Sequence, residues 1–112
     1  MLTDPEIVDL VRKYREDVSA ASSLSDAEWL KWFEKEVRYA WGRDVDERIS
    51  RMHVLVTTSE FHKHYSTIMD TEYWGRFSKE NAEYVVSHVG KESETVLRRI
   101  EEVLKATGEW DA

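Results

Sequence analysis

Residues 25–42, SDAEWLKWFEKEVRYAWG, decide the fold of this chain. Ser25 and Glu28 form a capping-box pattern, which predicts that a helix begins at residue 26. At about 100° per residue, one helical face collects the apolar residues Trp29, Leu30, Phe33, Val37, Ala40 and Trp41. Gly42 stands where glycine commonly ends a helix. The stretch therefore predicts an amphipathic helix over residues 26–41.

Caps and helical spacing predict further helices on both sides of this stretch. Asp4 and Pro5 stand as N-cap and first residue of a helix over 5–22. Asp44 to Glu47 reads as another capping box. Further helices are expected over 78–89, after a loop at 70–77, and from near residue 93 to Gly108. We therefore predict an all-α fold, a compact single-domain bundle of five to six short helices over residues 1–112, with a short flexible C-terminal tail at about 108–112.

Residues 52–58 leave three alternatives open. The apolar positions change phase near residues 57–59. Either the helix breaks there, with Thr57 or Thr58 as a new cap, or it continues and packs against neighbours on both sides. The segment is also rich in β-branched residues, so a strand over 52–58 is the third interpretation.

Composition excludes several classes of protein. The 112 residues are 41% hydrophobic, which suits one globular domain rather than a disordered chain. Sixteen Lys and Arg against 23 Asp and Glu give a net charge of −7, so direct nucleic-acid binding is disfavoured. The absence of cysteine excludes disulfides and cysteine-based metal or thiol chemistry. With no long apolar run and no signal-peptide pattern, we expect no membrane span and a cytoplasmic location, in the host cytosol if the protein is viral.

A second aromatic stripe on the 26–41 helix is the main candidate for an interface. Trp32 and Tyr39 are seven residues apart and lie off the apolar face. Glu28 and Glu36 flank them and would supply an acidic rim for a basic partner. The alternative is that another helix of the bundle covers this stripe.

Trp110 is a second interface candidate, because it lies between acidic residues in the tail. It either folds back onto the bundle or acts as a short docking motif for a partner.

The histidines give one candidate metal site, although we predict neither a bound metal nor a cofactor. His62 and His64 diverge on a helix and cannot share an ion. If residues 44–66 formed one unbroken helix, a metal could be shared by Asp46, His53, Glu60 and His64.

Arg48 and His53 carry a resemblance to an enzyme family. Their spacing resembles the Arg-x4–6-His element of the HEPN ribonucleases, which are small all-α domains. The resemblance implies that His53 acts as acid and base in RNA backbone cleavage while Arg48 stabilises charge. Ile49 stands where that family usually has a polar residue.

These features lead to one expected function and two rivals. The expected function is a non-enzymatic, acidic, helical protein–protein interaction module whose partner has a basic surface. Inhibitors, immunity proteins, viral anti-defence proteins and assembly adaptor subunits are of this type. The rivals are a small all-α enzyme, either HEPN-like or a metal-dependent hydrolase, and a homo-oligomeric structural subunit.

Overall fold

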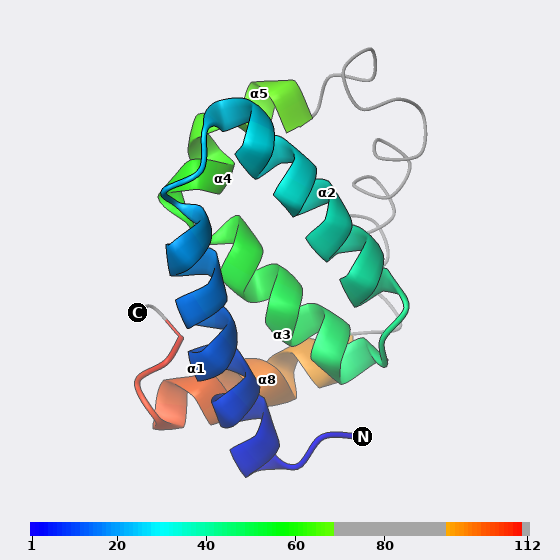
Figure 1. Cartoon of the computed structure of the whole chain (residues 1–112). Helices are drawn as coiled ribbons and strands as arrows, with labels where there is room; N and C mark the ends of the chain where they lie inside the picture. Colours follow the sequence, from blue (N-terminus) through cyan, green and yellow to red (C-terminus); the bar gives the residue numbers. More distant parts are fainter. Residues whose placement is uncertain (69–93, 111–112) are drawn as a thin grey trace.

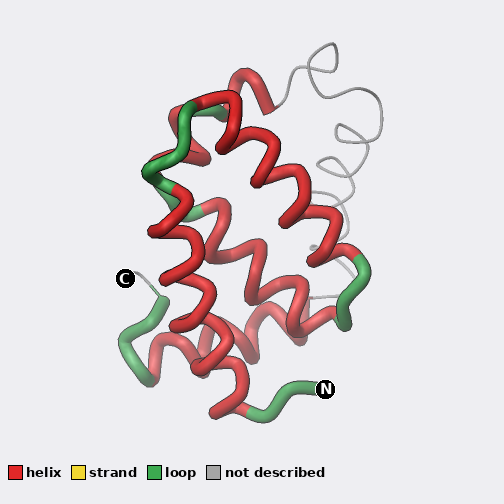
Figure 2. The backbone as a smooth tube through the Cα atoms, in the orientation of Figure 1, coloured by secondary structure: helices red, strands yellow, loops and turns green. Residues whose placement is uncertain are grey.

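A computed structural model of the chain describes residues 1–68 and 94–110, and all regular structure in this part is helical (Figures 1 and 2). The helices are α1 (Asp4–Ala21), α2 (Asp26–Trp41), α3 (Val45–Val56), α4 (Ser59–Lys63), α5 (Tyr65–Ile68) and α8 (Glu94–Ala106). The predicted all-α fold is confirmed. The loop expected at 70–77 and the helix expected at 78–89 lie outside the described residues.

Helix α1 begins one residue earlier than the sequence predicted, because Thr3 and not Asp4 is its N-cap. The Thr3 hydroxyl accepts a hydrogen bond from the Glu6 backbone N–H at 3.3 Å, and Glu6 accepts one from the Thr3 N–H at 3.0 Å. Asp4 could not form this reciprocal pair, since the residue three positions later is Ile7.

The capping box at Ser25 is confirmed, whereas the one at Asp44 is not formed. Ser25 and Glu28 exchange two hydrogen bonds, each 3.3 Å long. Asp44 is the N-cap of α3 but accepts no side-chain cap bond. The carboxylate of Glu47, which a box would require, instead pairs with Arg51 at 2.9 Å.

The segment over residues 52–58 is not a strand. Helix α3 continues to Val56, and the Thr57 hydroxyl donates to the His53 carbonyl at 2.8 Å. The Thr58 hydroxyl then accepts from the Phe61 N–H at 3.1 Å, which starts α4. The phase change in the sequence therefore marks the break between these two helices.

Helix α3 lies at the centre of the bundle and packs against α1, α2 and α8 (Figure 1). Ser50 and Leu55 of α3 are fully buried, and the Ser50 hydroxyl donates to the Asp46 carbonyl at 2.8 Å. Helix α3 also supplies Ile49 and Val54, and the core residues from the other helices include Ile7, Val11, Val18, Trp29, Phe33, Ile100 and Leu104. The predicted apolar faces of α1, α2 and the last helix thus meet around α3.

The C-terminal segment turns back onto the bundle after Gly108. Gly108 has a φ of +74°, and its N–H donates to the Lys105 carbonyl at 3.2 Å. The Glu109 N–H donates to the Leu104 carbonyl at 2.8 Å, which completes a Schellman motif. The Glu109 carboxylate then pairs with Arg12, at 2.7 Å, and with Arg15.

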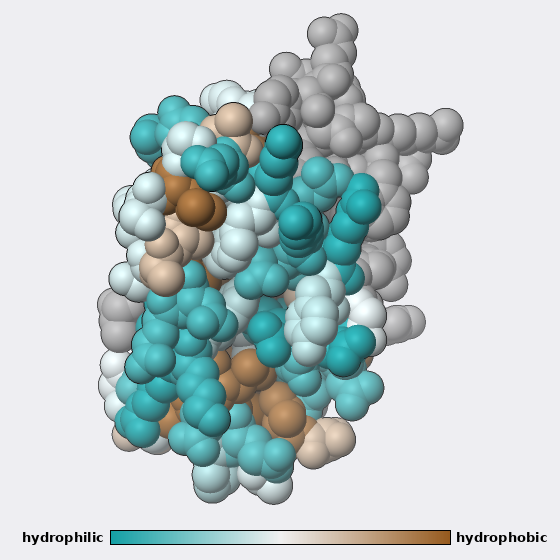
Figure 3. All heavy atoms as spheres, viewed as in Figure 1, coloured by the Kyte–Doolittle hydropathy of each residue, from teal (hydrophilic) through white to brown (hydrophobic). Residues whose placement is uncertain are grey.

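The face seen in Figure 3 is mainly hydrophilic, and apolar colour is confined to small areas. Within the described helices, none has the length and apolar character that crossing a membrane requires.

The two predicted capping boxes give a direct test of this local structure. We expect Ser25→Ala to lower the free energy of unfolding by about 1 kcal/mol, because the helix loses a hydrogen-bonded cap. Asp44→Ala should lower it by only a few tenths of a kcal/mol, because only the interaction with the helix dipole is lost. Urea denaturation of both variants measures the difference, and equal losses would contradict the assignment.

Glu109 gives a prediction about pH. Hydrogen bonding to Arg12 lowers the pKa of the Glu109 carboxyl in the folded state. The charged form therefore stabilises the fold above the unfolded pKa of about 4.3, and this contribution is lost as the pH falls through the lower folded value. We expect Glu109→Gln to lower the Tm at pH 7, and we expect its difference from the wild type to shrink as the pH falls through the lowered folded pKa of Glu109. Glu102→Gln, on the exposed surface of α8, is the control and should show no such pH-dependent difference.

Candidate functional site

The two aromatic residues of the predicted stripe on α2 have different surroundings. Trp32 is half-buried and packs against the core, with its ring centroid 6.0 Å from that of Trp29. Tyr39 is 47% exposed. The structure therefore places Trp32 partly inside the bundle and leaves Tyr39 as the accessible aromatic side chain of the pair.

Two arginine side chains flank the exposed ring of Tyr39. The Arg43 guanidinium carbon lies 4.6 Å from the ring centroid, and that of Arg51 lies 4.8 Å from it. Arg51 also lies 5.0 Å from the ring centroid of Tyr14 and pairs with Glu47. Arg43 has no carboxylate partner among residues 1–68 and 94–110. We call Tyr39, Arg43 and Arg51 the Tyr39 surface.

The two glutamates expected to form an acidic rim differ in position, because Glu36 lies near Arg51 whereas Glu28 lies at the far end of α2. Glu28 lies in the first turn of α2, about 16 Å along the helix axis from Tyr39. Its hydrogen bonds with Ser25 lower the pKa of the Glu28 carboxyl. Glu36 lies beside the Tyr14 hydroxyl, and partial burial raises the pKa of its carboxyl. Burial and the nearby Glu36 raise the pKa of Tyr14 well above its usual value. The charged groups against the Tyr39 ring are therefore cations.

Trp110 is folded back against α3, which is the first of its two predicted alternatives. Its ring stacks on that of His53, with centroids 4.2 Å apart and an interplanar angle of 12°. His53 Nε2 lies 3.0 Å from the Trp110 carbonyl oxygen, and Lys105 lies 6.0 Å from the indole. In this position the indole covers one face of His53.

The structure does not bring Arg48 and His53 to one site. They are five residues apart on α3, which separates them by about 140° around the axis. Arg48 reaches the Arg43 carbonyl at 3.5 Å, whereas His53 lies against Trp110. The two side chains therefore have different neighbours among the described residues, and the HEPN-like role of the pair stays a prediction.

The alternative metal site of Asp46, His53, Glu60 and His64 is not formed. It required one unbroken helix over 44–66, but α3 ends at Val56 and Thr58 starts α4. The four side chains have separate neighbours: Asp46 accepts from the Leu2 N–H, His53 contacts Trp110, Glu60 accepts from Ser59, and His64 lies 3.5 Å from Asp26. Across the residues that the structure describes, no group of three or more His, Asp or Glu side chains could hold a metal ion.

The arrangement around Tyr39 was only partly visible in the sequence. Arg43 is close to Tyr39 in the sequence but lies beyond the end of α2, so the helical spacing rule does not predict their contact. Arg51 comes from α3, and no local pattern connects it with Tyr39.

Comparison with known proteins gives no match to a family model, to a curated protein or to a solved structure.

The different burial of Trp32 and Tyr39 predicts different effects on stability. Trp32→Ala should lower the free energy of unfolding by about 2 kcal/mol or more, because it removes contacts with the core. Tyr39→Ala should lower it by about 1 kcal/mol or less, because Tyr39 is 47% exposed and the contacts of its ring with the guanidinium groups of Arg43 and Arg51 are weak. Denaturant titration measures both values, and a larger loss for Tyr39→Ala would show that its ring is part of the core.

Proposed function

We propose that the protein is a protein–protein interaction module that binds its partner through the Tyr39 surface. The observation that carries this proposal is an exposed tyrosine ring flanked by two guanidinium groups. Tyrosine and arginine are enriched among residues that dominate binding energy, because each combines a large contact area with hydrogen-bonding groups.

Rigidity of the Tyr39 surface supports the same proposal. Arg51 is fixed by its ion pair with Glu47 and by contacts with two tyrosine rings. A side chain that is already ordered loses less conformational entropy when a partner binds. The Tyr39 surface is thus prepared for contact before the complex forms.

The charges of the protein favour a partner in two ways, at long range and at contact. The net charge of −7 favours encounter with a basic protein at long range. At contact, Arg43 requires acceptor oxygens, which a partner supplies from backbone carbonyls or carboxylates. Size and net charge are also those expected of an inhibitor, an immunity protein or an adaptor subunit, and the proposal includes these classes.

Site-specific photo-crosslinking tests the proposal in the cells that make the protein. A photoreactive phenylalanine analogue at position 39 should cross-link to one discrete protein, and the same analogue at the exposed position 102 of α8 should not. Sedimentation velocity of the purified protein distinguishes a foreign partner from a second copy of the chain. Equal cross-linking from both positions, or none from position 39, would contradict the proposed surface.

Once the partner is identified, binding can be separated from folding. We expect Tyr39→Ala to weaken the complex by about 2 kcal/mol, or about 30-fold in Kd. Lys31→Ala, on the exposed surface of the same helix, is the control and should leave the Kd within about twofold. Calorimetric titration measures both, and equal effects would show that Tyr39 has no special role.

A further inference from the structure

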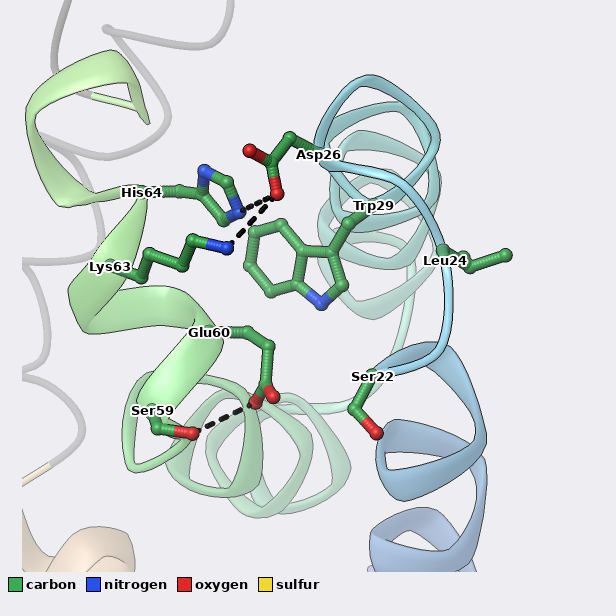
Figure 4. Close-up of a pocket in the computed structure, with 8 residues that line it drawn as sticks. All are labelled: Ser22, Leu24, Asp26, Trp29, Ser59, Glu60, Lys63 and His64. Atoms are coloured by element: carbon green, nitrogen blue, oxygen red, sulfur yellow. Dashed lines mark hydrogen bonds and ion pairs between the residues drawn. The ribbon is translucent and has the colours of Figure 1, made fainter.

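A small pocket lies between the start of α2 and α4, at the opposite end of α2 from Tyr39 (Figure 4). Its volume is about 250 Å³. The lining side chains that matter here are Ser22, Asp26, Trp29, Glu60, Lys63 and His64. They bring an indole N–H, hydroxyl groups and charges of both signs to one place.

Trp29 forms the inner wall of this pocket and carries a donor that no described residue satisfies. Its side chain is 2% exposed, and its ring stacks with Phe33 and His64 at centroid distances of 5.2 and 5.1 Å. The indole Nε1–H is buried and has no hydrogen-bond partner within the described part of the chain. Figure 4 shows this edge of the ring directed into the pocket, toward Ser22 and Glu60. Because buried donors are normally hydrogen-bonded, this N–H calls for an acceptor from outside the chain.

The two carboxylates of the pocket are not equivalent. Asp26 Oδ1 lies 3.1 Å from Lys63 Nζ and 3.5 Å from His64 Nε2, so a cation already faces it. The Glu60 carboxylate accepts from the Ser59 hydroxyl at 3.2 Å and has no cationic partner in residues 1–68 and 94–110. A negative charge without a counterion therefore lies on the side of the pocket that the indole N–H faces.

We propose that this pocket binds a small molecule that carries a primary ammonium group and a carbonyl-type oxygen. The ammonium group pairs with Glu60, and the oxygen accepts the hydrogen bond of Trp29 Nε1–H. Small-molecule pockets usually measure about 300 to 1,000 Å³, so a volume of about 250 Å³ limits the ligand to a few heavy atoms. The ligand class is thus a short amino amide or a compound of the same pattern.

Nitrogen-15 NMR of the full chain tests this site directly. The sequence has five tryptophans, so five indole N–H resonances are expected, and Trp29→Phe assigns the one from Trp29. The probes are glycinamide, β-alaninamide and 4-aminobutanamide, with propionamide and ethylammonium as the two half-ligands. We expect at least one amino amide to move the Trp29 resonance saturably, and each half-ligand to bind about tenfold more weakly or worse.

Two matched variants decide the role of Glu60. Glu60→Gln should raise the Kd of the tightest-binding amino amide about tenfold, because the ion pair is lost. Glu102→Gln should leave the Kd of the same compound unchanged. No saturable shift of the Trp29 resonance by any of the three amino amides would overturn the site. An unchanged Kd in Glu60→Gln would overturn the assignment of the cation. Glu60 is only partly buried, so Glu60→Gln should keep the fold, and any indole resonance that shifts saturably gives the Kd of the amino amide.

Discussion

Helix α3 packs against α1, α2 and α8, so its side chains must be buried around much of its circumference. Ser50 makes this possible, because a small residue whose hydroxyl bonds within its own helix can be fully buried in this crowded position. Other features depend on the same helix. Its Asp46 accepts from the Leu2 N–H, its His53 supports Trp110, and its Arg51 lies against Tyr39. The packing of α3 thus positions Leu2, Trp110 and the proposed binding surface.

Local signals in the sequence predicted most of the described helices, because a cap needs only residues that are close along the chain. Ser25 and Glu28 formed their box as expected. The expected capping box at Asp44 does not form, because the Glu47 carboxylate pairs with Arg51 instead of the Asp44 backbone N–H. The break after Val56 was visible as a change of phase, but only the threonine hydroxyl bonds decided between a strand and two helices.

The candidate sites were less predictable, because burial depends on contacts between helices. Trp32 and Tyr39 are seven residues apart on one helix, and the sequence placed both on the same aromatic stripe. Packing against the core covers Trp32, whereas Tyr39 meets only arginine side chains on its exposed side. The pocket beside Trp29 could not be predicted at all, since Glu60 and His64 come from a different part of the chain and no spacing rule connects them with α2.

The position of α8 has a consequence for protein synthesis. Ile100 and Leu104 are fully buried, and α8 packs against both α1 and α3. Helix α1 leaves the ribosome before α8, so the part of its apolar face that packs against α8 has no cover until residues 100–104 have been made. Until then, the nascent chain exposes the part of the α1 surface that packs against α8 in the folded protein. Binding by a chaperone would protect the chain in this interval, because exposed apolar helices associate readily.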